Sequence, residues 1–301
     1  MSATSFDILV APNSRQLLHN NGDQLLSADG GESFALQDGI AMLLQSQDLS
    51  EEQQREQTVF DTLQLQGLPY FRPLAFREAI EGITNALAGK VPQNCVELGG
   101  GEGHFAARLR QHFPAVNSYV CDLSLNSLKL AANGLLPIFA DITKPIFAPE
   151  TLDVAIFWVS LHHLNDQEQK NAIAETARAL RPGGVLMLYE PNAAFLPRQI
   201  VYKTALAQDV YADEAEKAVD FAKVAEMIKT NGLNLTDCRF ISPPYNLAFV
   251  KKLNNWPLYM ALVETLFRLD RLFIRPLVGA GSINSFSRHL TMYGSAIFIK
   301  K

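Results

Sequence analysis

A short glycine-rich segment constrains the fold of this chain more than any other feature. Glu97-Leu98-Gly99-Gly100-Gly101-Glu102-Gly103 ends an apolar run at 95–98 and directly precedes a segment with helical spacing at 105–113. Glycine lets the backbone turn sharply and lets a ligand lie against it without a clash with Cβ. Ligands of open α/β sheets bind at the carboxyl ends of the strands, where this loop falls. The segment therefore predicts a ligand-binding strand–loop–helix unit.

From residue 94 onward, strand-like and helix-like segments alternate. Strand-like runs lie at 95–98, 118–121, 135–140, 152–159 and 185–189, and helix-like segments lie at 105–113, 125–132 and 167–180, with Ser124 placed as an N-cap. This alternation predicts a parallel sheet with right-handed crossovers, which is a Rossmann-like α/β fold. A helix at 221–230 and strands at 235–241 and 292–299 are expected to follow.

Three regions are expected along the 301 residues. Residues 1–47 read as a small β module, because they lack a helical pattern and carry turn signals such as Asp29-Gly30-Gly31. Residues 48–90 form a helical lead-in. Residues 91–301 hold the Rossmann-like domain, with a helical insertion at about 243–290 that is too long for a bare loop.

Charge and composition exclude several classes of partner. The formal net charge is −5 and no basic block occurs, so a nucleic-acid partner is not expected. The three cysteines, Cys95, Cys121 and Cys238, form neither a metal-ligand spacing nor a disulfide framework. The start lacks a signal-peptide pattern, and no stretch of about 18 apolar residues is free of charge. We expect a soluble, cytoplasmic protein.

The acidic residues near the loop bear on which ligand binds there. A dinucleotide brings a pyrophosphate, which favours exposed amides without a nearby carboxylate. S-adenosylmethionine brings a cationic amino group and a sulfonium, with which Glu97 is compatible. Asp122, which ends the second strand, is placed to accept from ribose hydroxyls, and Asp141, which ends the third, from an adenine amino group. The run 101–106 also fits the dinucleotide pattern G-x-G-x-x-A, so from the loop alone both ligands, and a structural turn, stay open.

Five stretches in order resemble the motifs of class I S-adenosylmethionine-dependent methyltransferases. They are Glu97 to Gly103 (E/D-x-G-x-G-x-G), Val120-Cys121-Asp122-Leu123-Ser124, Ala140-Asp141-Ile142, residues 152–157 with Leu161-His162-His163-Leu164, and Leu180-Arg181-Pro182-Gly183-Gly184. The resemblance spans about residues 94–191. It implies a class I methyltransferase sheet with antiparallel last strands and S-adenosyl-L-methionine as cofactor. The cofactor-binding residues that it implies are Glu97, Gly99, Gly101, Gly103, Asp122, Leu123, Asp141, Ile142 and Phe157.

The first module resembles the small zinc ribbons that precede some bacterial methyltransferases. The positions of the metal ligands in those ribbons are held here by Ala11, Ser14, Ser27 and Gly30. Structural zinc needs about four Cys or His donors, so we expect no metal. An unrelated small β module is the alternative, and in either case the expected role is structural or partner-facing.

The expected catalytic residues are His162 and Glu190. Methyl transfer is an in-line displacement, so the protein must align the acceptor and, for a hydroxyl, remove its proton. His162 follows the fourth strand and is expected to act as the base, while Glu190 follows the fifth. A histidine at such a turn that only caps or packs is the alternative. Asn192 is a candidate for shaping the acceptor pocket, whereas Tyr70, Arg72 and Arg77 either close over the site or lie at the surface.

The insertion bears most on the acceptor. It carries a dense apolar set with three arginines: Trp256, Leu258, Tyr259, Leu262, Leu266, Phe267, Arg268, Leu269, Arg271, Phe273, Ile274 and Arg275. This apolar segment has three possible roles: a lid over an apolar acceptor site, a helix pair at a membrane surface, or a homodimer contact. None of them favours a macromolecular acceptor.

The sequence therefore predicts a methyltransferase that acts on a small, apolar metabolite or lipid-linked acceptor. O-methylation is preferred because candidate bases line the turn. The alternatives are an NAD(P)-dependent oxidoreductase and a methyltransferase-like scaffold without turnover, which the degenerate ribbon motivates.

Overall fold

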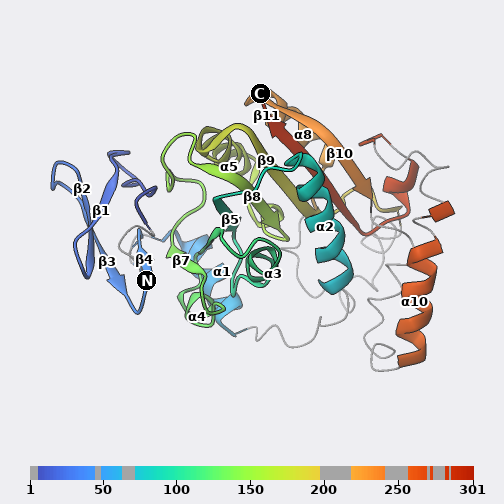
Figure 1. Cartoon of the computed structure of the whole chain (residues 1–301), viewed down its shortest axis with the longest axis horizontal. Coiled ribbons are helices and arrows are strands. Elements are labelled where there is room, and N and C mark those ends of the chain that lie inside the picture. The colour runs from blue at the N-terminus through green and yellow to red at the C-terminus, as the bar shows by residue number, and fades with distance from the viewer. Residues whose placement is uncertain are drawn as a thin grey trace.

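The computed structural model describes residues 6–44, 49–62, 72–196, 218–240, 257–269, 272–273, 282–284 and 286–301. The strands of these residues form one mixed sheet of eleven, in the order β1-β2-β3-β4-β7-β6-β5-β8-β9-β11-β10 (Figure 1). The strands are β1 (Leu18–Asn20), β2 (Gln24–Ser27), β3 (Ser33–Gln37), β4 (Ile40–Met42), β5 (Asn94–Leu98), β6 (Asn117–Asp122), β7 (Leu136–Phe139), β8 (Leu152–Trp158), β9 (Leu180–Pro191), β10 (Leu233–Phe240) and β11 (Tyr293–Lys300). The helices are α1 (Glu51–Thr62), α2 (Arg72–Ala86), α3 (His104–His112), α4 (Leu125–Lys129), α5 (Asp166–Ala179), α8 (Phe221–Thr230) and α10 (Pro257–Leu269), with 3-10 turns η2 (Leu161–His163) and η5 (Phe286–His289).

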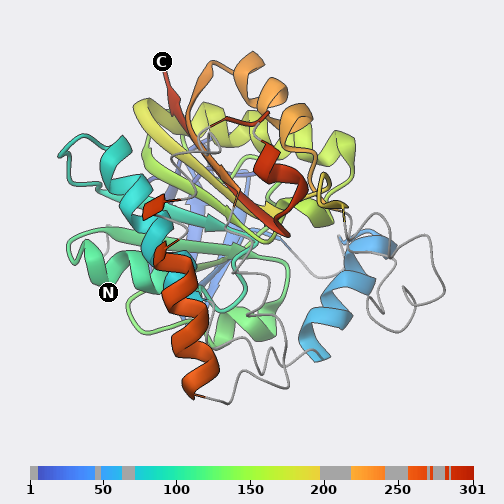
Figure 2. The same cartoon turned by 90° about the vertical axis from the view of Figure 1, so that its right-hand side faces the viewer.

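The centre of the sheet is the expected Rossmann-like arrangement. Strands β7, β6, β5, β8 and β9 are parallel, and β11 lies antiparallel between β9 and β10. Helices α2 and α3 pack on one face, and α5 and α8 on the other (Figure 2). The prediction of a class I methyltransferase sheet is confirmed. Of the two last strands, β11 alone runs against the parallel strands, because β10 is antiparallel to β11 and so runs with them.

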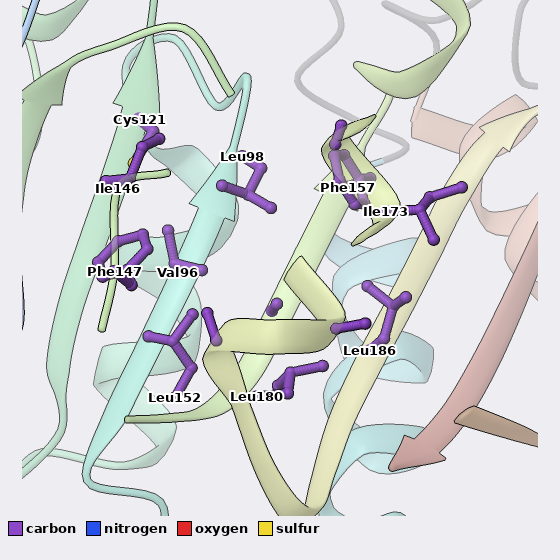
Figure 3. Close-up of a cluster of buried hydrophobic side chains, with 14 of the residues drawn as sticks. Val96, Leu98, Cys121, Ile146, Phe147, Leu152, Phe157, Ile173, Leu180 and Leu186 are labelled. Atoms are coloured by element: carbon purple, nitrogen blue, oxygen red, sulfur yellow. The ribbon is translucent and has the colours of Figure 1, made fainter. Parts of the chain in front are cut away.

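The core explains why the central strands are apolar almost throughout. All of β8 except Trp158 is buried, because helices cover both faces. On the α5 face, Leu98, Phe157 and Leu186 from three neighbouring strands pack together with Ile173 of the helix (Figure 3). This packing holds the strand ends, and the loops that follow them, at fixed separations.

Local signals set the bounds of several elements. Ser124 is the expected N-cap, and its Oγ accepts the N–H of Ser127 at 3.1 Å. The helix that it starts is shorter than the predicted 125–132, because α4 ends in a turn whose N–H groups bond three residues back and which leads to Gly134. The predicted turn at 181–184 lies inside β9, where Gly183 has φ 78° and the register with β8 shifts.

The N-terminal module continues the main sheet. Its strands β1 to β4 form antiparallel hairpins, and β4 then runs parallel to β7 with Ala41 opposite Ile138. Leu18 and Leu25 are fully buried and join the same core as the central strands. The module is therefore built onto the methyltransferase sheet.

Within the described ranges, no helix combines the length and the apolar character required for a membrane span. Of the predicted insertion, α10 and η5 are described, whereas Trp256, Arg271, Ile274 and Arg275 lie outside the described residues.

Candidate functional site

The glycine-rich loop turns at the carboxyl end of β5 in a conformation that requires glycine. Gly99, Gly101 and Gly103 have φ values of 67°, 54° and 70°, in the left-handed region that L side chains disfavour. A Cβ added at Gly99 would lie 2.6 Å from Cβ of Ser160, and one at Gly103 would lie 2.5 Å from Leu135 Cδ1. The loop is thus packed tightly between the ends of β6 and β8.

The side chain of Glu97 packs against this loop and connects it to helix α3. Its side chain is buried, and Oε2 accepts the N–H of Ala106, in the first turn of α3, at 2.8 Å. A carboxylate there interacts favourably with the positive end of the helix dipole. Because a Cβ at Gly100 would lie 2.7 Å from Glu97 Cγ, the loop closes directly over this side chain.

Asp122 joins the end of β6 to the loop. Its Oδ2 accepts the N–H of Gly101 at 2.7 Å, and its Oδ1 accepts the N–H of Ser124 at 2.7 Å. The expected ribose-binding carboxylate is therefore beside the glycines, as the motif requires. Leu123, the next residue, presents its carbonyl oxygen to the side chain of Gln57 at 2.9 Å.

Asp141 follows β7, on the neighbouring strand end. Its Oδ1 accepts both the N–H and the hydroxyl of Thr143, at 2.8 and 2.7 Å, and its Oδ2 accepts from Gln53 Nε2 at 3.1 Å. Ile142 lies close to the loop, since its Cδ1 is 3.9 Å from the position of a Cβ on Gly99. Asp122 and Ile142 thus lie beside the loop, whereas Asp141 is bonded to Thr143 and Gln53, and Phe157 is fully buried in the core on the α5 face (Figure 3).

The chain is strained where β8 ends beside this loop. Val159 has φ 54°, which is an outlier for a β-branched residue. Its N–H donates to the carbonyl of Tyr189 at 2.7 Å, and the hydroxyl of Ser160 donates to the carbonyl of Leu98 at 2.6 Å. Strained backbone held by such bonds is typical of functional sites.

His162 and Glu190, predicted separately, form a buried pair. His162 Nδ1 lies 2.7 Å from Glu190 Oε2, and both side chains are almost inaccessible. The N–H groups of Ser160 and Leu161 donate to Glu190 Oε1 at 3.0 and 2.9 Å. Because a carboxylate only accepts, Nδ1 carries a proton, and in the neutral ring Nε2 holds the lone pair.

His163 lies against this pair. Its ring centroid is 4.0 Å from that of His162. Burial, and secondarily the charge of His162, lowers the pKa of His163 to about 3. His163 is therefore neutral at neutral pH.

An aromatic stack supports the strand ends from the other face of the sheet. Trp158 lies between Phe105, with a centroid distance of 4.7 Å, and Tyr189, at 3.9 Å. Tyr293 continues the stack, 5.4 Å from Tyr189. The rings link α3 with β8, β9 and β11 and so restrain the strained turn at Val159.

Other residues singled out in the sequence are structural or lie elsewhere. Asn192 is buried, and its amide donates to the carbonyls of Arg288 at 2.6 Å and Thr291 at 3.0 Å, which ties the end of β9 to η5. Arg77 is exposed on α2, whereas Tyr70 and the side chain of Arg72 lie outside the described residues.

Hydrogen bonds join several residues at or beside the positions that the ribbon resemblance assigned to metal ligands. Glu32 accepts from Asn13 Nδ2 at 3.2 Å and from the N–H of Ser14 at 3.0 Å. Gln16 and Asp29 bond reciprocally, at 2.9 and 3.0 Å, and the N–H of Gly31, followed by the Ser27 hydroxyl, lowers the pKa of Asp29. In the part of the chain that the structure describes, no group of three or more His, Cys, Asp or Glu is arranged to hold a metal ion.

Sequence comparison identifies the central segment. Residues 95–184 match a protein family described as a methyltransferase domain. This segment is similar to a methyltransferase domain. The match covers the glycine loop, both acids and the His162 turn, and it supports S-adenosylmethionine as the cofactor rather than a nicotinamide. No curated protein matches the chain.

Solved structures resemble this chain at low identity. The SAM-bound phosphoethanolamine N-methyltransferase 2 of Haemonchus contortus is 13% identical, with a TM-score of 0.50, over 74% of this chain and 52% of that one. A SAM-dependent methyltransferase of Archaeoglobus fulgidus is 14% identical, with a TM-score of 0.49, over 76% and 94% of the two chains. The cyclase SpnF is 15% identical, with a TM-score of 0.48, over 75% and 81%. This chain thus spans about half of the Haemonchus protein.

The contacts of helix α1 with the site were not predicted from the sequence. Gln53 and Gln57 contact the strand ends after β7 and β6, but nothing in the sequence places a polar helix there. The one local signal was Ser50-x-x-Gln53, a pattern that starts helices.

Proposed function

We propose that this protein transfers the methyl group of S-adenosylmethionine to a hydroxyl of a small, apolar metabolite or lipid-linked acceptor in the cytoplasm. The observation that carries the proposal is the buried contact between His162 and Glu190, 2.7 Å long. His162 lies in η2, after the end of β8, whereas Glu190 lies inside β9, one residue before its end, and Ser160 beside this pair touches the glycine loop. A base is therefore held next to the loop expected to bind the cofactor.

The two residues have different roles in this proposal. Glu190 accepts three hydrogen bonds, from two backbone N–H groups and from His162. It is a positioning residue that fixes the imidazole and stabilises its protonated form. His162 Nε2 takes the proton of the acceptor hydroxyl as that oxygen attacks the methyl carbon.

The surroundings of the loop fit an S-adenosyl cofactor. At Gly101 a Cβ would meet nothing closer than 3.8 Å, so a ligand can approach the loop there, and the carboxylates of Glu97, Asp122 and Asp141 lie at or just after the ends of β5, β6 and β7. Carboxylates suit a cationic amino group and sulfonium better than a pyrophosphate. When bound, the cofactor supplies the methyl group and departs as S-adenosylhomocysteine.

Exposed apolar residues of α10 support an apolar acceptor. Leu258, Leu262 and Leu269 are exposed by 86%, 53% and 45%, and they fall on one side of the helix. Tyr259 of the same helix packs against the core next to α2. We propose that α10 serves as a cover for the acceptor, with a membrane surface and a second copy of the chain as the other candidate contacts of its leucines.

The proposal is tested first by isothermal titration with S-adenosylmethionine, S-adenosylhomocysteine and NADH in parallel. Binding of the first two alone is expected. Binding of NADH alone would establish an oxidoreductase, and binding of none would favour the scaffold.

Turnover is then measured as transfer of labelled methyl to a panel of apolar alcohols, phenols and amines. We expect transfer to hydroxyl groups, and His162→Gln should lower kcat by about 10²- to 10⁴-fold while cofactor affinity is kept. Full activity of His162→Gln would refute its role as the base.

A further inference from the structure

Helix α1 is joined to the cofactor side of the sheet through two glutamines one helical turn apart. Gln53 and Gln57 are four residues apart and so share one face of α1. Gln53 Nε2 donates to Asp141 Oδ2 at 3.1 Å, and Gln57 Nε2 donates to the carbonyl of Leu123 at 2.9 Å. One helix (light blue, at the right of Figure 2) thus links the ends of β7 and β6.

Gln53 is held at both ends of its amide group. Its Oε1 accepts the N–H of Ser50 at 3.0 Å, while the hydroxyl of Ser50 accepts the N–H of Gln53 at 3.2 Å. This reciprocal pair is the capping box that begins α1. Turning Nε2 away from Asp141 would also turn Oε1 away from the Ser50 N–H and so break the cap of the helix. The amide of Gln53 is therefore held in the orientation in which it donates to Asp141.

The bonds to Asp141 leave its carboxylate with one defined acceptor direction. Oδ1 accepts two bonds from Thr143, and Oδ2 accepts one from Gln53. A carboxylate offers about four acceptor sites, two on each oxygen. Among the residues that the structure describes, these bonds leave one site, which is on Oδ2, and its direction is set by the side chain of Gln53.

We propose that Gln53 is a positioning residue that aims Asp141 Oδ2 at the 6-amino group of the cofactor's purine ring. This inference rests on the proposed function, because it requires an S-adenosyl ligand at the ends of β6 and β7. A 6-amino group can donate a hydrogen bond to Asp141 Oδ2. A 6-oxo group cannot, because it is an acceptor like the carboxylate oxygen that it would face. Helix α1 thereby contributes to the specificity for the purine base. Gln57 contributes only by bonding the helix to the carbonyl of Leu123.

The experiment compares S-adenosylhomocysteine with its deaminated analogue, S-inosylhomocysteine, by titration into the full-length protein. The wild type should prefer the adenosyl ligand by at least about tenfold. Gln53→Glu keeps an oxygen for the Ser50 N–H but cannot donate to Asp141 when ionised. It should reduce the preference to less than about threefold, as should Gln53→Ala. Asp141→Asn, whose amide can donate, should shift the preference toward the inosyl ligand.

Gln57→Ala is the matched control, since it removes the other glutamine contact of α1 and leaves Asp141 untouched. It should weaken both ligands by the same factor and keep the preference. Circular dichroism of Gln53→Glu, expected to equal that of the wild type, shows that the cap is intact, while its Tm should fall slightly because two carboxylates then face each other.

Three outcomes would overturn the inference. An unchanged preference in both Gln53 variants would reduce Gln53 to a helix cap, and tighter adenosyl binding by Gln53→Ala would make it a competitor of the cofactor. A wild type that binds both ligands equally would remove the inference and leave the proposed function standing. If the wild type binds neither these ligands nor S-adenosylmethionine, the proposed function itself fails.

Discussion

Gly99 and Ser160 approach so closely that a Cβ on the glycine would lie 2.6 Å from Cβ of the serine. The contact joins the loop after β5 to the turn after β8, where the hydroxyl of Ser160 also donates to the carbonyl of Leu98 at 2.6 Å. The cofactor loop and the candidate base are therefore positioned by one shared contact.

Gly99→Ala should be much more damaging than Gly101→Ala. Both residues have positive φ, which costs about 1–2 kcal/mol for alanine, but a Cβ at Gly101 meets nothing closer than 3.8 Å. The crowding at Gly99 should add about 1–3 kcal/mol, measured by urea unfolding. Ser160→Gly should recover part of that addition in Gly99→Ala, and equal losses in the two alanine variants would show that the contact is unimportant.

Asp122→Ala should weaken binding of S-adenosylhomocysteine by about 1–3 kcal/mol. The variant removes the expected ribose acceptor and also the partner of the Gly101 N–H. Titration calorimetry measures the change, with Asp166→Ala, an exposed carboxylate at the start of α5, as the control. Unchanged affinity in Asp122→Ala would mean that the ribose lies elsewhere.

His163 should make the protein sensitive to acid. Its pKa is lowered to about 3 in the folded protein, against roughly 6.5 when unfolded. Its stabilisation is therefore complete above pH 6.5 and is lost as the pH falls toward 3. The loss is up to about 1.4 kcal/mol per pH unit.

The sensitivity is measured as the free energy of unfolding in urea between pH 7 and pH 4. In His163→Gln, the free energy of unfolding should fall less steeply with falling pH than in the wild type, by up to about 1.4 kcal/mol per pH unit. This difference in slope is expected whatever the stability of the variant at pH 7. Parallel curves for the two proteins would contradict the assignment.

The N-terminal module should be stable without zinc. Elemental analysis is expected to find less than one zinc per chain, and a strong chelator should leave the Tm unchanged. Glu32→Ala should lower stability by about 1 kcal/mol, because it removes the acceptor of Asn13 and of the Ser14 N–H. A full equivalent of zinc would refute the account of a degenerate ribbon.

The central sheet was predictable because its signals are local. The glycine loop, the acids that end β6 and β7 and the cap at Ser124 each need only a few neighbouring residues to be recognised. The resemblance to methyltransferase motifs then implied that the sheet ends in antiparallel strands, and β11 does run antiparallel to β9.

The pairing of side chains was not predictable, because it depends on register. His162 and Glu190 are 28 residues apart and meet because Trp158 lies opposite Tyr189. Gln53 and Asp141 are 88 residues apart, and their contact depends on how a polar helix packs on the strand ends. The parallel pairing of β4 with β7 could not be predicted either, because the sequence of a short strand does not indicate which strand it pairs with.

That last pairing has a consequence for solubility. A parallel sheet that ended at β7 would present a row of unpaired N–H and C=O groups, a template on which another chain can add a strand. Here Ala41 and Met42 occupy that edge opposite Ile138 and Phe139, and the outermost strand β1 is only three residues long. The module thus covers the edge of the sheet that would otherwise favour aggregation, so we expect a fragment that lacks it to aggregate.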